Sequence, residues 1–276
     1  MIVVSLTTTS RRLLFCRAAL ISLFSQSRRP DKIFVWLSKD KYLRDEGVED
    51  LRFVNAAFEI LPEGMRDIVS FEWVENTGPY RKLIPFLQSE LESDIVVTAD
   101  DDIFYGESWL ELLIANFDPG SRVVHAARVR KKIKNPIGRY AGYVFWPIIK
   151  RPIVLSDDWI VTYGGGAVLC KSWFSKELIN DKGYLRVAPT ADDLWYSKIC
   201  QLSNVKVKVV PEALEQLNFI QHDDGLVNHN YPIASGFVSK LKCKLIDYPL
   251  NYLRIVKFGN DKAYDAIEEY FHMKCS

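Results

Sequence analysis

The sequence predicts one α/β domain with a mainly parallel central sheet, flanked by helices. Two observations predict it: short apolar runs rich in β-branched residues, and stretches of helical length that connect them. A third is an acidic cluster where one such run ends, since open α/β sheets bind ligands at the carboxyl ends of their strands. Hydrophobic residues make up 48% and charged residues 26% of the 276 residues, the balance of a globular protein.

The first strand–helix–strand unit is expected in residues 2–37. The run IVVSL at 2–6 is short and apolar, as in a strand buried on both faces. Hydroxyl residues at 7–10 follow, and we expect one of them to cap a helix over 11–25. KIFVWL at 32–37 then predicts a second, parallel strand.

The next elements lead to the acidic cluster. FEWV at 71–74 predicts a strand, residues 80–91 a helix, and DIVVTA at 94–99 a buried strand. Three consecutive aspartates end that strand, and a helix is expected over 108–117. The cluster is therefore predicted to lie between a parallel strand and a helix.

The second half of the chain carries more basic and aromatic residues. The expected elements are strands at 123–129, 143–149 and within 159–170, a helix at 192–200, a strand at 205–210 and a last helix at 262–273. We expect one domain over residues 1–276, divided into a nucleotide-binding half (1–118), an acceptor-side half (119–230) and a C-terminal extension (231–276).

Charge and cysteine content narrow the partners and the compartment. A net charge of +1 argues against a polyanion binder, so no nucleic acid is expected. Five scattered cysteines without a CxxC pair argue against a disulfide framework or a structural zinc site, and favour a reducing cytoplasm. The N-terminus is typical of a buried strand rather than a signal peptide, and no stretch approaches the ~18 apolar residues of a membrane span.

Residues 121–156 contain nine lysines or arginines and no acid. Such a run is usually a solvated face. Aromatic residues interleave it, so a surface for an anionic partner is the alternative.

The aspartates Asp100, Asp101 and Asp102 have three possible explanations. In the first explanation they stabilise the N-terminus of a helix, for which a single aspartate would suffice. In the second they include a phosphatase-type nucleophile, which Phe104 disfavours because Thr or Val stands at that place in the pattern. In the third they hold a divalent cation, which removes the repulsion among them. The third explanation is preferred, with Mn²⁺ or Mg²⁺ as the cation.

The quoted segments resemble GT-A-fold glycosyltransferases. The resemblance rests on VVSLTTTSRR, SLFSQ, NTGPYRKLIP, TADDDI and APTADDLWY, and covers roughly residues 1–200. It is closest to the family-2-like bacterial enzymes of surface polysaccharide synthesis, such as lipopolysaccharide or capsule. It implies a Rossmann-like sheet and transfer of a sugar from a nucleotide-sugar.

The resemblance also implies roles on the donor side. The residues implied to contact the nucleotide or its phosphates are Thr7, Thr8, Thr9, Arg11 and Lys82, with Arg81 second to Lys82. Asp102 is implied to bind the metal most directly, and Asp100 to hold the ribose or to join the metal through water, with Asp101 sharing either role. The aspartate that the family usually has after the second strand is not clearly present, because Asp40 comes three residues late. A UDP-sugar is nevertheless the expected donor.

Roles on the acceptor side follow in the same way. Gly165 and Gly166, in the run 164–166, are implied to border the donor sugar and the acceptor, with a tight turn as the alternative. Asp192 or Asp193 is implied to be the general base of an inverting reaction, with Asp193 preferred and the other capping the helix. Trp195 is either a floor for the acceptor or a core residue. His222 and His229 are candidates for a late metal ligand.

The expected partners are thus a UDP-sugar and a saccharide or lipid-linked saccharide. Basic and apolar residues at 236–258 favour peripheral contact with the inner face of the membrane. Two alternatives remain. A sugar-nucleotide pyrophosphorylase needs a glycine-rich basic loop that TTTSRR lacks, and a non-catalytic carbohydrate-binding protein would not need both acidic motifs.

Overall fold

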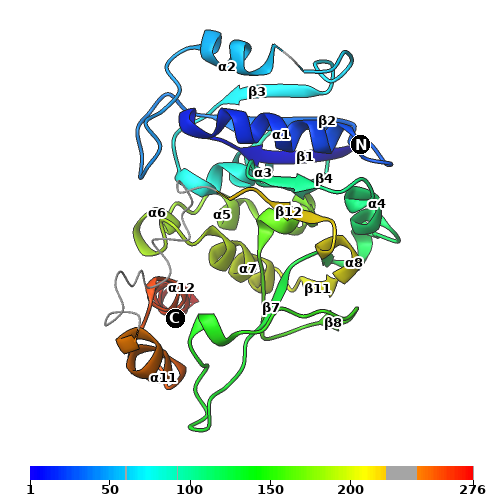
Figure 1. The fold of residues 1–276 in the computed structure, drawn as a ribbon. Coiled ribbons are helices and arrows are strands. Elements are labelled where there is room, and N and C mark those ends of the chain that lie inside the picture. Colours follow the sequence, from blue (N-terminus) through cyan, green and yellow to red (C-terminus); the bar gives the residue numbers. More distant parts are fainter. Residues whose placement is uncertain (60, 92, 222–240, 276) are drawn as a thin grey trace.

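The computed structural model describes residues 1–59, 61–91, 93–221 and 241–275. Within them the chain forms an eight-stranded sheet of order β3-β2-β1-β4-β10-β6-β11-β8 and two small two-stranded sheets. Figure 1 shows the large sheet running through the middle of the molecule, with α2 beyond the β3 edge and α11 and α12 at the opposite end. The predicted α/β class is confirmed.

The elements have the following bounds. The strands of the large sheet are β3 (Val69–Trp73), β2 (Lys32–Leu37), β1 (Ile2–Thr7), β4 (Ile95–Thr98), β10 (Ala167–Cys170), β6 (Val123–Ala126), β11 (Lys206–Val209) and β8 (Val154–Leu155). The two-stranded sheets pair β5 (Ile103–Tyr105) with β12 (Leu217–Phe219), and β7 (Val129–Lys131) with β9 (Trp159–Val161). The α-helices are α1 (Leu13–Phe24), α2 (Leu51–Phe58), α3 (Ile84–Gln88), α4 (Trp109–Ile114), α5 (Lys176–Ile179), α6 (Tyr184–Val187), α7 (Asp192–Leu202), α8 (Pro211–Leu214), α11 (Tyr248–Tyr252) and α12 (Gly259–Cys275).

The first four strands are parallel, and this aligns their carboxyl ends. In β1, Val4 lies opposite Ile33 of β2 on one side and opposite Val97 of β4 on the other. β10 runs antiparallel to both β4 and β6, so the sheet is mixed beyond β4. The loops after β1 and β4 therefore leave the sheet at the same edge, which is where the site forms.

Alternate residues of the strands pack into two separate cores. Val4 and Val97 contribute to the core under α1 and α4. Val3 and Val96, their sequence neighbours, contribute to the core that α3, α7 and α12 cover. Both faces of the strands are buried, which explains why the strands are continuous apolar runs rather than alternating ones.

Several expected elements differ from the structure. The strand expected at 143–149 is wrong: Tyr143–Phe145 is one turn of 3-10 helix, and the backbone N–H of Tyr143 bonds Asp261 rather than a strand. The expected helix at 80–91 is shortened to α3, because Pro85 takes an early position of the helix, where it needs no N–H donor. The apolar run at 123–129 is divided between β6 and β7.

Candidate functional site

A cavity of about 390 Å³ lies at the carboxyl ends of the parallel strands. Its wall combines the loop after β1, the turn before α3, the loop after β4 and the start of α7. The predicted site residues on the wall are Thr7, Thr8, Thr9, Arg11, Lys82, Asp100, Asp101, Asp102, Asp192 and Asp193. Segments far apart in the sequence thus meet in one pocket.

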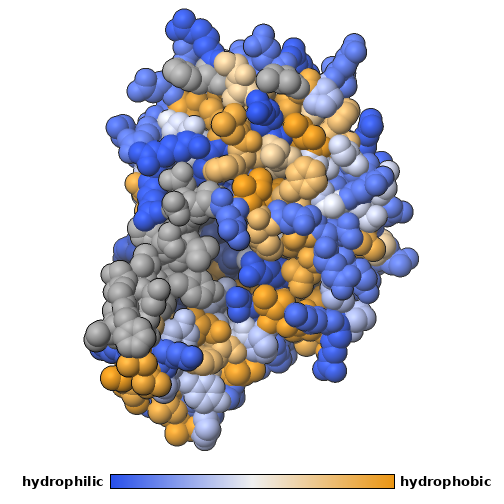
Figure 2. Space-filling view, viewed as in Figure 1, coloured by the Kyte–Doolittle hydropathy of each residue, from blue (hydrophilic) through white to orange (hydrophobic). Residues whose placement is uncertain are grey.

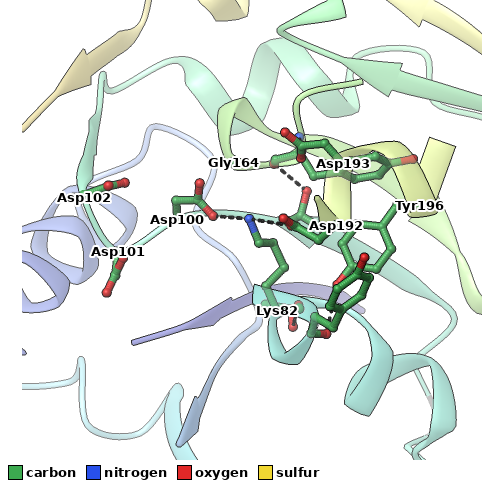
Figure 3. Close-up of polar contacts among 12 residues, drawn as sticks. Lys82, Asp100, Asp101, Asp102, Gly164, Asp192, Asp193 and Tyr196 are labelled. Carbon is green, nitrogen blue, oxygen red and sulfur yellow. Dashed lines mark hydrogen bonds and ion pairs between the residues drawn. The ribbon is translucent and has the colours of Figure 1, made fainter. Parts of the chain in front are cut away.

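Lys82 links the two acidic motifs. Its Nζ lies 2.5 Å from Oδ1 of Asp100 and 3.2 Å from Oδ2 of Asp192. Figure 3 shows the ammonium group between the two carboxylates. Burial disfavours the charged lysine, but Asp100 and Asp192 outweigh it and raise the pKa of Lys82 well above its ordinary value. A contact between Lys82 and a substrate phosphate remains a prediction. The structure adds the ion pairs of Lys82 with Asp100 and Asp192.

The three consecutive aspartates have different surroundings. Asp101 is buried against Arg12, whose guanidinium also lies 2.7 Å from Oδ2 of Asp102. Burial raises the pKa of Asp101 to about 6, against the opposing charge of Arg12. The side chains of Asp100 and Asp102 are 32% and 24% exposed to solvent, so two of the three carboxylates are accessible from the cavity. Asp101 is the anchor of the loop.

The donor set fits a divalent cation that substrate phosphates help to bind. Among the described residues, no group of three His, Cys, Asp or Glu side chains is placed to hold a metal ion. Mg²⁺ and Mn²⁺ prefer hard oxygen ligands, and Mg²⁺ usually takes only one or two carboxylates together with phosphates and water. Asp100 and Asp102 supply two such carboxylates on the cavity wall. His222 and His229 lie outside the described residues.

The glycine run lies against the acidic loop. A Cβ on Gly164 would lie 1.8 Å from Oδ2 of Asp100, so any larger residue there would displace that carboxylate. Gly166 has a φ of +107°, and its Cβ would lie 2.6 Å from the Trp109 ring. Gly165 and Gly166 are not on the cavity wall: Gly165 packs against Arg128, and Gly166 against Trp109. Their place beside the donor sugar and the acceptor remains a prediction.

Side chains from two elements, β5 and α4, fix this glycine turn. The Tyr105 hydroxyl donates to the carbonyl of Gly164 at 2.8 Å and accepts the backbone N–H of Asp100 at 2.7 Å. Trp109 Nε1 donates to the carbonyl of Gly165 at 2.9 Å. Sequence reasoning missed Tyr105 and Trp109, because each reads as an apolar residue of a strand or helix.

Asp193 has the surroundings of a general base. Its Oδ1 accepts the backbone N–H of Tyr163 at 2.9 Å. Burial and then the neighbouring charge of Asp192 raise the pKa of Asp193 to about 7. Burial also raises the pKa of Asp192, while Lys82 opposes the shift. A carboxyl group that titrates near pH 7 can both accept and release a proton under neutral conditions.

The helix-capping roles expected of the acidic pair 192–193 and of the threonines at 7–9 are wrong. Ala191 precedes α7 and no side chain caps that helix, so neither aspartate caps it. Likewise no threonine caps α1, which a 3-10 turn precedes. Thr7 instead donates its hydroxyl to the carbonyl of Trp36 at 2.8 Å. Asp192 and Asp193 nevertheless lie in the first turn of α7, where their negative charge suits the helix dipole.

The structure also places Trp195, Asp40 and Asp45. Trp195 is fully buried against Tyr270 and Phe271, which makes it a core residue and not an acceptor floor. Asp40 is exposed and is not on the cavity wall, whereas Asp45 is. The sequence shows no signal for Asp45, because its role depends on a buried ion pair with Arg81 at 2.7 Å.

Comparisons with known proteins give similarities of fold. No family model and no curated protein matches the sequence. The galactosyltransferase LgtC, solved with donor and acceptor sugar analogues, is 15% identical over 46% of each chain, with a TM-score of 0.34. S. aureus TarS (residues 1–349) is 18% identical over 76% of this chain and 58% of that one, with a TM-score of 0.47. The 4-diphosphocytidyl-2C-methyl-D-erythritol synthase of Anaerococcus prevotii is 14% identical over 82% and 95%, with a TM-score of 0.47.

This chain therefore spans less than half of LgtC and under two thirds of the TarS structure. All three TM-scores are below 0.5, so the chemistry of this chain has to be inferred from its own residues.

Proposed function

We propose that the chain is a GT-A-type glycosyltransferase that transfers a sugar from a UDP-sugar to a saccharide or lipid-linked saccharide in bacterial surface polysaccharide synthesis. One observation carries the proposal: Lys82 joins the acidic loop after β4 to the acidic pair of α7 inside one cavity. In the family that the sequence resembles, the first motif holds the donor and the second supplies the base. A scaffold would have no need to bury both motifs around one lysine.

The donor is proposed to bind in the half formed by residues 1–118. Thr7, Thr8, Thr9 and Arg11 line the cavity beside the acidic loop and would contact the nucleotide. Asp100 and Asp102 would hold Mn²⁺ or Mg²⁺. When bound, the cation supplies positive charge that stabilises the diphosphate leaving group.

The acceptor is proposed to bind beside Asp193, in the half formed by residues 119–230. Asp193 takes the proton of the acceptor hydroxyl, and that oxygen attacks the anomeric carbon from the side opposite the diphosphate. The bond between the sugar and the diphosphate breaks, and the configuration inverts. Asp192 is the poorer base because its carboxylate is paired with Lys82.

The C-terminal extension is proposed to touch the cytoplasmic face of a membrane. No helix in the described ranges is both long and apolar enough to span one. The exposed apolar side chains near α11 are Leu241, Leu245, Ile246 and Ile255. Lys242 and Lys244 are exposed beside them, and Figure 2 shows apolar side chains over this lower end of the molecule. Apolar and cationic groups together suit an anionic leaflet.

The proposal is tested by product analysis with UDP-sugars, Mn²⁺ and a lipid-linked saccharide fraction. A glycosyltransferase releases UDP, and the Asp193→Asn variant releases far less. A pyrophosphorylase instead makes UTP when pyrophosphate is added. If no donor of a full nucleotide-sugar panel gives up its own nucleotide, either by sugar transfer or with added pyrophosphate, the enzymatic proposal is wrong.

A further inference from the structure

Two arginines, Arg128 and Arg130, stand on the cavity wall at the start of β7. Arg128 immediately precedes β7 and Arg130 lies within it, and both residues line the cavity. The carbonyl of Arg128 accepts the N–H of Thr162 at 2.8 Å, which continues the β7–β9 ladder. The next residue, Tyr163, donates its N–H to Asp193. The backbone thus places the arginine pair beside the proposed base.

The charges of these two arginines are not matched by carboxylates. The other buried cations of the cavity wall are neutralised inside the protein: Arg12 by Asp101 and Asp102, Arg81 by Asp45, and Lys82 by Asp100 and Asp192. In the part of the chain that the structure describes, no ion pair within 4.0 Å involves Arg128 or Arg130.

Both guanidinium groups are nevertheless held in place. Arg130 Nη1 donates to the carbonyl of Trp146 at 2.7 Å, and the group lies 5.1 Å from the Tyr143 ring. Its Nε is buried without a hydrogen-bond partner among the described residues. Arg128 lies 5.4 Å from the Phe219 ring. A partly buried, positioned donor without an acceptor is costly unless a ligand supplies one.

The chemistry of the pair selects an oxyanion. A guanidinium fork matches the two oxygens of a carboxylate or a phosphate, and aromatic rings support it without neutralising it. The donor diphosphate is assigned to Asp100, Asp102 and a cation, while Arg128 bonds through its carbonyl to Thr162, the residue before the one that donates to Asp193. The charged group is therefore carried by the other substrate.

We propose, on the basis of the glycosyltransferase function proposed above, that the acceptor is an anionic saccharide whose phosphate or carboxylate binds Arg128 and Arg130. This assigns part of the basic run at 121–156 to substrate binding. Other members of the run serve the structure: Lys132, for example, is buried against the rings of Tyr140 and Tyr264.

The test is a saccharide array that holds phosphorylated and carboxylated oligosaccharides beside their neutral counterparts. It is probed with the whole protein in the presence of UDP and Mn²⁺. The Arg128→Met/Arg130→Met double variant is compared with Lys131→Met, which removes one charge from the same strand at a half-exposed position that does not line the cavity. Metal-dependent UDP binding by calorimetry and thermal unfolding are measured for each protein.

The expected result is that the wild type and Lys131→Met retain anionic saccharides at least about 10-fold over neutral ones. The double variant loses that preference and keeps its UDP affinity within about 2-fold, which also shows that it folds. Equal retention of neutral saccharides, or no retention of anionic ones, overturns the proposal. Loss of UDP affinity in a folded double variant assigns the arginines to the donor and overturns it too. Absence of metal-dependent UDP binding in the wild type is a failure of the proposed function itself.

Discussion

Lys82 is the residue that connects the two halves of the site. Its ammonium group is buried between Asp100 and Asp192, so removing it leaves carboxylates without their counter-ion. Breaking a buried pair in this way costs about 3–5 kcal/mol, because the remaining charge stays desolvated. Asp100 is partly exposed, and water will screen some of that cost.

We therefore expect Lys82→Met to lower the free energy of unfolding by about 3 kcal/mol in urea denaturation at pH 8. Lys182→Met is the matched control, because Lys182 pairs with Glu75 on the surface, where such pairs contribute about 0–1 kcal/mol. Equal, small losses of unfolding free energy in both variants would show that the ion pairs of Lys82 do not hold the two acidic motifs together.

Asp193 determines the expected pH dependence of the reaction. A general base works only when deprotonated, and its pKa is raised to about 7. The rate of transfer should fall as the pH drops below about 7, and Asp193→Asn should lower kcat by about 10²–10⁴-fold with nucleotide binding kept. A pH–rate profile of the wild type and steady-state kinetics of the variant measure both. A variant with near-normal kcat would exclude Asp193 as the base.

The same pKa has a consequence for stability. A carboxyl whose pKa is higher in the folded protein than in the unfolded chain favours folding at low pH. Its contribution is full below the unfolded pKa of about 4 and is lost as the pH rises to about 7. Asp193→Asn should therefore remove this decline in the free energy of unfolding between pH 4 and 7. Above pH 7 the variant should gain stability relative to the wild type.

At the scale of elements, the turn of Tyr163–Gly165 sets the position of the acidic loop. Gly164 lies so close to Asp100 that a methyl group would displace the carboxylate. At Gly165 a Cβ would meet Arg128 Cβ at 3.1 Å, so the neighbour needs to yield only slightly.

We expect Gly164→Ala to weaken metal-dependent nucleotide binding by at least about 10-fold, a loss of about 1.4 kcal/mol. Gly165→Ala should change it by less than about 3-fold. Calorimetry with UDP and Mn²⁺ compares the two variants, with circular dichroism as a check of folding. A larger loss of binding in Gly165→Ala than in Gly164→Ala would contradict the close contact between Gly164 and Asp100.

An element could be predicted from the sequence where its own residues determine its conformation. The strands at 2–7, 32–37 and 95–98 follow from β-branched runs, and the structure places them within one or two residues of expectation. The run at 143–149 is also apolar but is no strand, because the backbone of Tyr143 bonds Asp261 and the ring of Trp146 packs on Tyr264. That outcome depends on a helix more than a hundred residues later, which no local pattern contains.

At the scale of the whole molecule, the parallel order of β1 and β4 explains why the motifs could be found from the sequence. Loops that leave parallel strands at their carboxyl ends must meet, so the threonine loop and the aspartates converge. Arg12 and Asp45 could not be found in this way. Each matters because of a partner brought by tertiary folding, and neither differs in the sequence from a surface charge.

The C-terminal extension gives a prediction for the whole molecule. Wild-type protein should float with vesicles rich in anionic lipid at low salt, and Leu245→Asp/Ile246→Asp should reduce the captured fraction several-fold. Leu14→Asp, an exposed position on α1, is the control and should float as the wild type does. Capture that the double variant leaves unchanged would place any membrane contact elsewhere.

The central claim is that the accessible aspartates of the acidic loop hold a cation that binds a nucleoside diphosphate. Calorimetric titration of UDP, GDP and CMP with and without Mn²⁺ measures it directly, on the wild type, Asp102→Ala and the exposed control Asp40→Ala. We expect UDP binding that requires Mn²⁺, persists in Asp40→Ala and is lost in folded Asp102→Ala. Binding of no nucleotide in a metal-dependent manner, or undiminished binding by Asp102→Ala, would contradict it.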